Sequence, residues 1–349
     1  MARKGVSALP RKYDTDADLM RVAAAFFVVM IHASGTRTLA AVSYNALARF
    51  SVPVFIMLSG WYMLARPIDG KRLARKIGTL LALSLAWSAV FYVYDLLCGA
   101  RSWEGPRALA AYLLTQPFHL WYLWALIALY LFTPLFSVFV GHAARPQYRY
   151  ALLLTFVFGS PVVIALRSGR APVLAAIVDN MKVAYLLGFV FCYLLGGYFR
   201  RWGCDLGGKR GRGVLYALGA LGLLVTVFGT RRLSAGGEID QLLESFFAPN
   251  VLASSAAFFV LVKRICAKRS FSPRFSAVLR ESADCTLGVY LLHPLLLLML
   301  QRGALMHALY DGPDLVFVPL RTALVFVAAT LLVLLVKRVP LLKRLVATH

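Results

Sequence analysis

The sequence is poor in charged residues, which make up 15% of its 349 residues, whereas hydrophobic residues make up 60%. Soluble domains carry about a quarter charged residues, so this composition excludes an ordinary water-soluble fold. The mean hydropathy of +0.72 supports the same conclusion. In lipid, every backbone N–H and C=O group must pair within the chain, which leaves helices or closed barrels. The apolar runs are long and continuous rather than alternating, and this pattern favours helices.

Cysteine is also scarce, with five residues scattered along the chain. None of them forms a C-x-x-C pair or a spacing typical of metal ligands. We therefore expect the cysteines to be small packing residues, and we predict no metal site.

Acidic residues are fewer than basic ones, 15 against 38, and the formal net charge is +23. If the N-terminus lies in the cytoplasm, the basic residues cluster in the cytoplasmic connections between spans. This distribution is the positive-inside pattern of membrane proteins. The densest clusters are at 71–76, 200–212 and 263–280. Topology therefore explains most of the positive charge. No nucleic-acid-binding motif accompanies it, so we expect no nucleic-acid partner.

Ten apolar segments are long enough to cross a hydrocarbon core of roughly 30 Å. They lie near Leu19–Gly35, Tyr44–Leu64, Ile77–Leu97, Leu120–Val140, Tyr150–Leu166, Val183–Phe199, Val214–Gly229, Phe246–Val262, Thr286–Gln301 and Val318–Val336. We predict an all-α integral membrane protein of about ten transmembrane helices, with both termini cytoplasmic. Residues 1–349 are expected to form one transmembrane domain, with tails at 1–17 and 337–349. The first span is expected to remain uncleaved, and the short connections leave no room for an appended soluble domain.

Ionisable residues inside a bilayer are costly and usually face the protein interior, which makes the first span informative. Arg21 and His32 are separated by about three helical turns, so they share one face about 16 Å apart. Asp18 lies one turn before Arg21 and can pair with it. A neutral imidazole can take a proton from a hydroxyl, as a general base does. The structural alternative is a buried histidine that bonds to a neighbouring helix.

The second span and the segment after it contain further polar residues. Ser59 and Gly60 permit close helix approach, and Pro53 frees a backbone carbonyl. Arg72 and Arg75 follow one helical turn apart, and two guanidinium groups on one face can bind phosphates in bidentate fashion. Membrane anchoring is the structural alternative for this arginine pair.

An aromatic segment opens the fourth span, where Trp121, Tyr122 and Trp124 could simply form an interfacial belt. In the ninth span, His293 lies near the middle of the membrane and shares a helix face with Tyr290. Pro294 cannot donate to the Tyr290 carbonyl, which leaves a polar acceptor nearby.

Arg49 and Arg321 are further charged residues within predicted spans. The sequence suggests no role for Arg321. His32, Arg49 and His293 would be unexplained in a purely structural membrane scaffold, because charged and titratable groups at membrane depth are costly.

Together these segments resemble the acyltransferase 3 family of membrane-bound acyltransferases over about Asp18 to Val336. The resemblance is carried by Arg21 and His32 with ten residues between them, V-P-x-F-x-x-x-S-G at Val52–Gly60, R-x-x-R at Arg72 and Arg75, W-[FY]-L-x-x-L-[IL]-x-x-Y at Trp121–Tyr130, and Y-L-x-H-P at Tyr290–Pro294. Five segments in this order on a ten-span hydropathy profile form a specific pattern.

The resemblance implies transfer of an acyl group, commonly acetyl, from cytoplasmic acetyl-CoA as co-substrate to a hydroxyl of a cell-surface or lipid-linked glycan. It implies that His32 is the catalytic base and Arg21 its partner, and that Arg72 and Arg75 bind the CoA phosphates. It also implies a multi-pass protein of the bacterial inner membrane that contacts lipids and has no permanently bound cofactor. The chain is similar to stand-alone members without an appended extracytoplasmic domain.

Candidate donors to the developing oxyanion are Ser59, Tyr290 and His293, and Asp18, Trp121 and Tyr130 are further candidate site residues. The alternative function is a secondary transporter of a lipid-linked sugar or small anion, because membrane-depth histidine and arginine suit either class. A non-catalytic scaffold is the third possibility.

Overall fold

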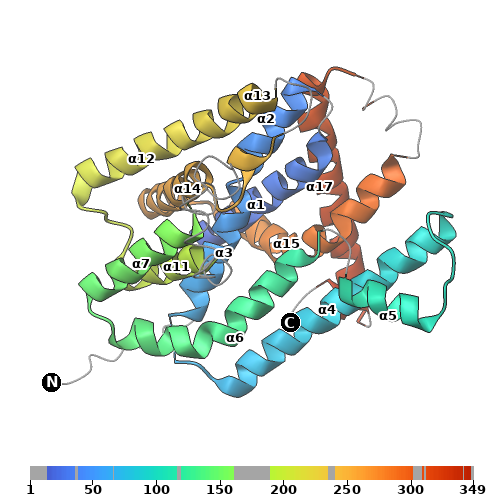
Figure 1. Ribbon diagram of the computed structural model, residues 1–349, viewed down its shortest axis with the longest axis horizontal. Helices are drawn as coiled ribbons and strands as arrows, with labels where there is room; N and C mark the ends of the chain where they lie inside the picture. Colours follow the sequence, from blue (N-terminus) through green and yellow to red (C-terminus); the bar gives the residue numbers. More distant parts are fainter. Residues whose placement is uncertain are drawn as a thin grey trace, which may run out of the picture.

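The computed structural model describes residues 14–35, 38–65, 67–115, 119–160, 189–234, 240–301, 309, 312–340 and 342–346. These residues form helices and connections, with no strand among them (Figure 1). The elements are α1 (Thr15–Ser34), α2 (Leu39–Ala48), α3 (Ser51–Met63), α4 (Gly70–Leu97), α5 (Pro106–Thr115), α6 (Trp121–His142), α7 (Arg145–Gly159), α11 (Val190–Trp202), α12 (Gly208–Leu224), the π-helix η1 (Val225–Gly229), α13 (Thr230–Leu233), the 3-10 helix η3 (Leu242–Glu244), α14 (Pro249–Lys268), α15 (Pro273–Leu300), α17 (Asp314–Arg338) and the 3-10 helix η4 (Leu342–Leu345). The predicted all-α class is confirmed.

Within the described residues, eight helical stretches are long and apolar enough to cross a membrane. They account for all the predicted spans except the fifth and sixth. Those two fall partly on residues 161–188, outside the described part, and α7 and α11 are their described portions. The chain is thus a multi-pass membrane protein, and the count of ten spans stays a prediction.

The predicted second span is a pair of helices, α2 and α3, with a turn at Arg49 and Phe50 between them. The turn has a physical cause, because Pro53 has no N–H to donate to the carbonyl one turn earlier. Because α2 ends at this turn, Pro53 lies at the start of α3. The first N–H groups of a helix have no partner within it, so the missing N–H of Pro53 removes no hydrogen bond from α3. The consequence is that Arg49 lies at a helix end in the protein interior, half-buried.

Helix α1 lies at the centre of the bundle and contacts α2, α3, α14, α15 and α17. In Figure 1, α12 and α13 run along the upper edge and α4 and α5 along the lower right, with α1 and α3 between them. Apolar side chains on α12, among them Val214, Leu218 and Leu221, are exposed. Apolar exposure at the edge and polar contacts at the centre are what a lipid environment requires.

Close approach at Gly60 is confirmed. A Cβ atom there would collide with the backbone carbonyl of Tyr193 in α11, and one at Gly196 would collide with the carbonyl of Met57 in α3. The two helices therefore pack backbone to backbone through small residues, as is common in membranes. This contact fixes the position of α3 and, with it, the position of Ser59.

Candidate functional site

The two functional residues predicted on α1 lie at opposite ends of that helix. At the Thr15 end, the guanidinium Nη1 of Arg21 is 3.4 Å from Oδ1 of Asp18, and its Cζ lies 5.2 Å from the ring centre of Tyr62 in α3. The predicted pairing with Asp18 is present. His32 lies about three turns further along the helix, so Arg21 does not touch it. Any contribution of Arg21 to chemistry at His32 is therefore indirect.

His32 lies in a cluster of three imidazole rings that belong to three different parts of the chain. The ring centres of His32 and His293 are 5.1 Å apart, and those of His293 and His119 are 6.4 Å apart. His119 precedes α6, and His293 is on α15; both are buried. His119 was not predicted as a site residue, although it stands two residues before Trp121, where the aromatic segment of the fourth span begins.

The hydrogen bonds of His293 define which ring nitrogen carries the proton. Its Nδ1 lies 3.0 Å from the Val289 carbonyl, and the backbone of Tyr290, whose carbonyl Pro294 leaves free, lies close enough to act on the ring. A carbonyl only accepts, so Nδ1 must be the donor. In the neutral ring, Nε2 then keeps its lone pair. The predicted acceptor at Tyr290 thus lies next to the ring, and the bond to Val289 fixes the orientation of His293.

Hydroxyl-bearing residues connect the two ends of α1 through the interior. The Ser59 hydroxyl of α3 lies close enough to Tyr122 and Tyr130 of α6 to act on both phenols, and the charge of Arg21 acts on Tyr130. The Tyr122 ring centre is 5.5 Å from that of Tyr290, whose own ring centre is 6.3 Å from that of His293. We call Tyr130, Ser59, Tyr122 and Tyr290 the interior polar row. It includes three of the predicted site residues, which the fold brings together.

A cavity of about 230 Å³ lies beside His32 at the Ser34 end of α1. Its polar lining comes from His32, Asn45 and Gln301, and its apolar lining from Ile31, Pro294, Leu297 and Leu298, with Gly35 at the edge. His32 is half-buried, whereas Gly35 and Gln301 are exposed. The imidazole on α1 thus borders a space that small molecules can reach.

A charged pair stands near this cavity. Nη2 of Arg49 is 2.9 Å from Oε2 of the buried Glu244, and the charge of Arg49 acts on His32. Trp121, 38% exposed, stacks on Phe246 with ring centres 5.5 Å apart, and Phe246 in turn lies under Arg49. The predicted site residue Trp121 therefore belongs to an aromatic stack next to Arg49 rather than to the imidazole cluster.

Arg321, for which the sequence suggested no role, holds the end of α1. Its buried guanidinium donates to the carbonyls of Ala33 at 2.7 Å and Ser34 at 3.0 Å, and it pairs with Asp314 at 2.7 Å. The last carbonyls of a helix have no partner within it, and a cation there is electrostatically favourable. Arg321 therefore fixes the helical turn that carries His32.

The predicted phosphate-binding arginines lie at the other end of the bundle. Arg72 and Arg75 are exposed in the first two turns of α4, and the Asp69 side chain caps that helix by accepting from the backbone N–H of Lys71 and Arg72. The charges of both Arg72 and Arg21 act on Lys76. Arg21 and the α4 cations thus occupy the same end, and this end is open to solvent.

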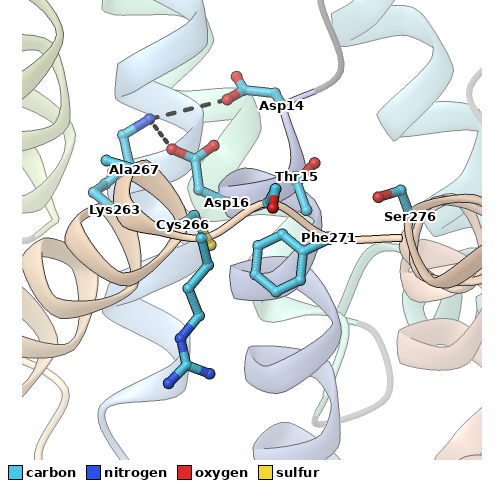
Figure 2. Close-up of a pocket in the computed structure, with 10 residues that line it drawn as sticks. Asp14, Thr15, Asp16, Lys263, Cys266, Ala267, Phe271 and Ser276 are labelled. Atoms are coloured by element: carbon cyan, nitrogen blue, oxygen red, sulfur yellow. Dashed lines mark ion pairs between the residues drawn. The ribbon is translucent and has the colours of Figure 1, made fainter. Parts of the chain in front are cut away.

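A second, larger cavity of about 410 Å³ lies where the Thr15 end of α1 meets α14 and α15 (Figure 2). Lys263 points to both Asp14 and Asp16, at 3.9 and 2.5 Å. Burial raises the pKa of the Asp14 carboxyl, but hydrogen bonds with Asp16 and Tyr62 and the nearby Lys263 charge hold it below its usual value. The wall of this cavity carries two carboxylates, Asp14 and Asp16, and two cations, Lys263 and Arg269, so its formal charges balance.

The chain matches a family model described as an acyltransferase domain, Acyl_transf_3, over residues 14–338. No curated protein and no solved structure matches the chain. The matched segment includes all three imidazoles and every site residue predicted from the sequence.

Proposed function

The chain belongs to the acyltransferase 3 family and is an acyltransferase, and we propose that it transfers an acetyl group from cytoplasmic acetyl-CoA to a hydroxyl of a cell-surface or lipid-linked glycan. The observation that supports this most directly is the position of His32, half-buried beside a cavity and 5.1 Å from the His293 ring. We place the protein in the inner membrane of a bacterium, with residue 14 on the cytoplasmic side.

In the proposed reaction, His32 takes the proton of an acceptor hydroxyl that has entered the cavity. The hydroxyl oxygen attacks the thioester carbonyl carbon, which forms a C–O bond and a tetrahedral oxyanion. When the carbonyl re-forms, the C–S bond breaks, and the CoA sulfur leaves with the proton that His32 had taken. The products are an acetyl ester and free CoA.

The structure bears on which group stabilises the oxyanion. Ser59 donates to the Phe55 carbonyl, Tyr290 to the His119 carbonyl and His293 Nδ1 to the Val289 carbonyl. The three candidate donors from the sequence thus have their protons engaged by backbone carbonyls. The fixed charge of Arg49 acts on His32, and a cation in a water-poor site favours developing negative charge. We assign this electrostatic role to Arg49.

We place the donor along the length of α1. CoA is polyanionic, so its phosphates belong at the exposed end, near Arg72, Arg75 and Arg21. The thioester must reach His32, about 16 Å further along the helix axis. A long, thin pantetheine arm can span this distance, and the interior polar row marks its route. In this arrangement Arg21 contributes to donor binding rather than to proton transfer.

The test uses the purified full-length protein with acetyl-labelled acetyl-CoA and methyl glycosides of glucose, mannose, galactose and N-acetylglucosamine. Wild type should form acetyl-sugar ester, and His32→Ala should lower kcat by about 10²–10⁴-fold, the range typical of a lost general base. The matched control is His142→Ala, because His142 is exposed at the end of α6. An active His32→Ala variant would remove His32 from the mechanism. The family match favours transfer over transport, and a wild type that forms no ester would contradict the proposal.

A further inference from the structure

The amide of Asn45 is held in one orientation by the end of α1. Its Nδ2 donates to the Ile31 carbonyl at 2.9 Å and to Ser34 Oγ at 3.1 Å. Because the Ile31 carbonyl can only accept, the atom that faces it must be the amide nitrogen. Ser34 Oγ donates its own proton to the same carbonyl at 3.0 Å, so it is free to accept from Asn45. The orientation of the amide therefore follows from its partners.

The other amide atom, Oδ1, is buried and has no hydrogen-bond partner among the described residues. Asn45 is only 6% exposed, and it lines the same cavity as His32. A buried carbonyl oxygen without a donor is costly, about 1–3 kcal/mol, and native proteins rarely leave one unsatisfied. A donor that arrives with a ligand would satisfy it.

The cavity itself restricts what that ligand can be. Its volume is about 230 Å³, which is below the usual range of about 300–1,000 Å³ for drug-sized ligands, so it suits one ring rather than a chain of rings. One part of the lining is polar, with His32 and Asn45, and another is apolar, with Pro294 and Leu297. A sugar ring offers the same combination, with hydroxyls at its edge and C–H groups on its faces.

We propose that Asn45 Oδ1 accepts a hydrogen bond from a second hydroxyl of the acceptor while His32 receives the proton of the hydroxyl that is acylated. The preferred acceptor is therefore a polyhydroxyl ring with a non-acylated hydroxyl close to the reactive one. This inference rests on the proposed function. Asn45 is a positioning residue: it selects which hydroxyl of the ring reaches His32.

The test is a comparison of acceptors and variants. The probes are the best of the four methyl glycosides above and its monodeoxy analogues, each with acetyl-CoA. Wild type should lose about tenfold in kcat/KM on one monodeoxy analogue that keeps the acylated hydroxyl, the size expected for one hydrogen bond. Asn45→Ala should lose about the same on the parent glycoside and no longer distinguish it from that analogue.

The control variant is Ser34→Ala, which removes one partner of Nδ2 and leaves Oδ1 in place. It should keep the wild-type preference for the parent glycoside. The KM for acetyl-CoA should be unchanged in both variants, which checks that the fold and the donor site are intact. If Asn45→Ala does not fold, Asn45→Ser replaces it, because a serine hydroxyl can still donate to a backbone carbonyl.

Two outcomes would overturn the inference: a wild type that is indifferent to every deoxygenation away from the acylated hydroxyl, or an Asn45→Ala variant that keeps the wild-type discrimination. Failure of the proposed function looks different, since it would leave wild type without ester formation on any glycoside.

Discussion

The guanidinium of Arg321 and the carbonyl of Ala33 form a 2.7 Å hydrogen bond between α17 and the last turn of α1. Ala33 directly follows His32, so this bond sets the height and rotation of the turn that carries the imidazole. The same guanidinium reaches Ser34 and Asp314, and Asp314 Oδ2 in turn accepts from Thr38 Oγ1 at the start of α2. One buried arginine thus ties α17 to both α1 and α2.

Replacing Arg321 should mainly lower the stability of the protein, because its guanidinium holds helix ends together. Arg321→Met removes a buried cation, so the Ala33 and Ser34 carbonyls lose this donor and the Asp314 carboxylate loses its cationic partner. We expect a loss of about 3–5 kcal/mol in the free energy of unfolding, as is typical when one member of a buried ion pair is removed. Unfolding in mixed detergent by denaturant titration measures it. Arg338→Met, at the exposed end of the same helix, should change the free energy by less than about 0.5 kcal/mol. Equal stability of the two variants would contradict the role given to Arg321.

Much of the fold could be predicted because lipid imposes strict requirements on a chain. Backbone pairing and span length mark helices such as α6, α14 and α17 in the sequence itself. The turn between α2 and α3 was harder to predict. Pro53 indicates a freed carbonyl, but the apolar residues continue through Arg49, and a proline alone does not decide whether a helix kinks or is interrupted. Residues 273–285, the first part of α15, were not predicted as part of a span, because their charged residues lower the local hydropathy.

The candidate site could be predicted only in part. Ionisable residues within apolar spans indicated His32 and His293, because such residues rarely face lipid. Their contact with each other and with His119 could not be predicted, since it depends on how α15 and the start of α6 pack against α1. Asn45 gave no signal either: a single amide in an apolar helix is common, and its significance lies in an unpaired oxygen beside a cavity.

The contact between α3 and α11 gives a sharp test of backbone packing. Gly60→Ala would place a Cβ atom on the carbonyl of Tyr193, and backbone cannot move aside as a flexible side chain can. We expect destabilisation of about 1–3 kcal/mol, the usual cost of overpacking. Gly78→Ala is the matched control in α4, where the added atom has nothing within 4 Å. It should stabilise the protein by about 0.5–1 kcal/mol, because alanine is the better helix former. Thermal melts of both variants should therefore shift in opposite directions, and shifts of the same sign would contradict the close packing of α3 and α11.

The exposed arginines of α4 should affect donor binding and leave stability unchanged. Arg72→Ala with Arg75→Ala removes two cations that can hold phosphates through paired hydrogen bonds. We expect the Kd for CoA to rise about 10- to 100-fold, at about 1.4 kcal/mol for each factor of ten. The melting temperature should stay near that of wild type, since both side chains are exposed.

Calorimetric titration of the purified protein with CoA at low and high salt measures this prediction. The affinity of wild type should fall as salt rises, because exposed charges are screened, and the double variant should show a weaker salt dependence. The control is Lys209→Ala with Arg210→Ala, which removes the same charge from the exposed start of α12. If that pair weakens CoA binding as much as the α4 pair does, the effect is one of net charge. If neither pair changes the affinity, Arg72 and Arg75 anchor the helix in the membrane surface, and the phosphates of CoA bind elsewhere.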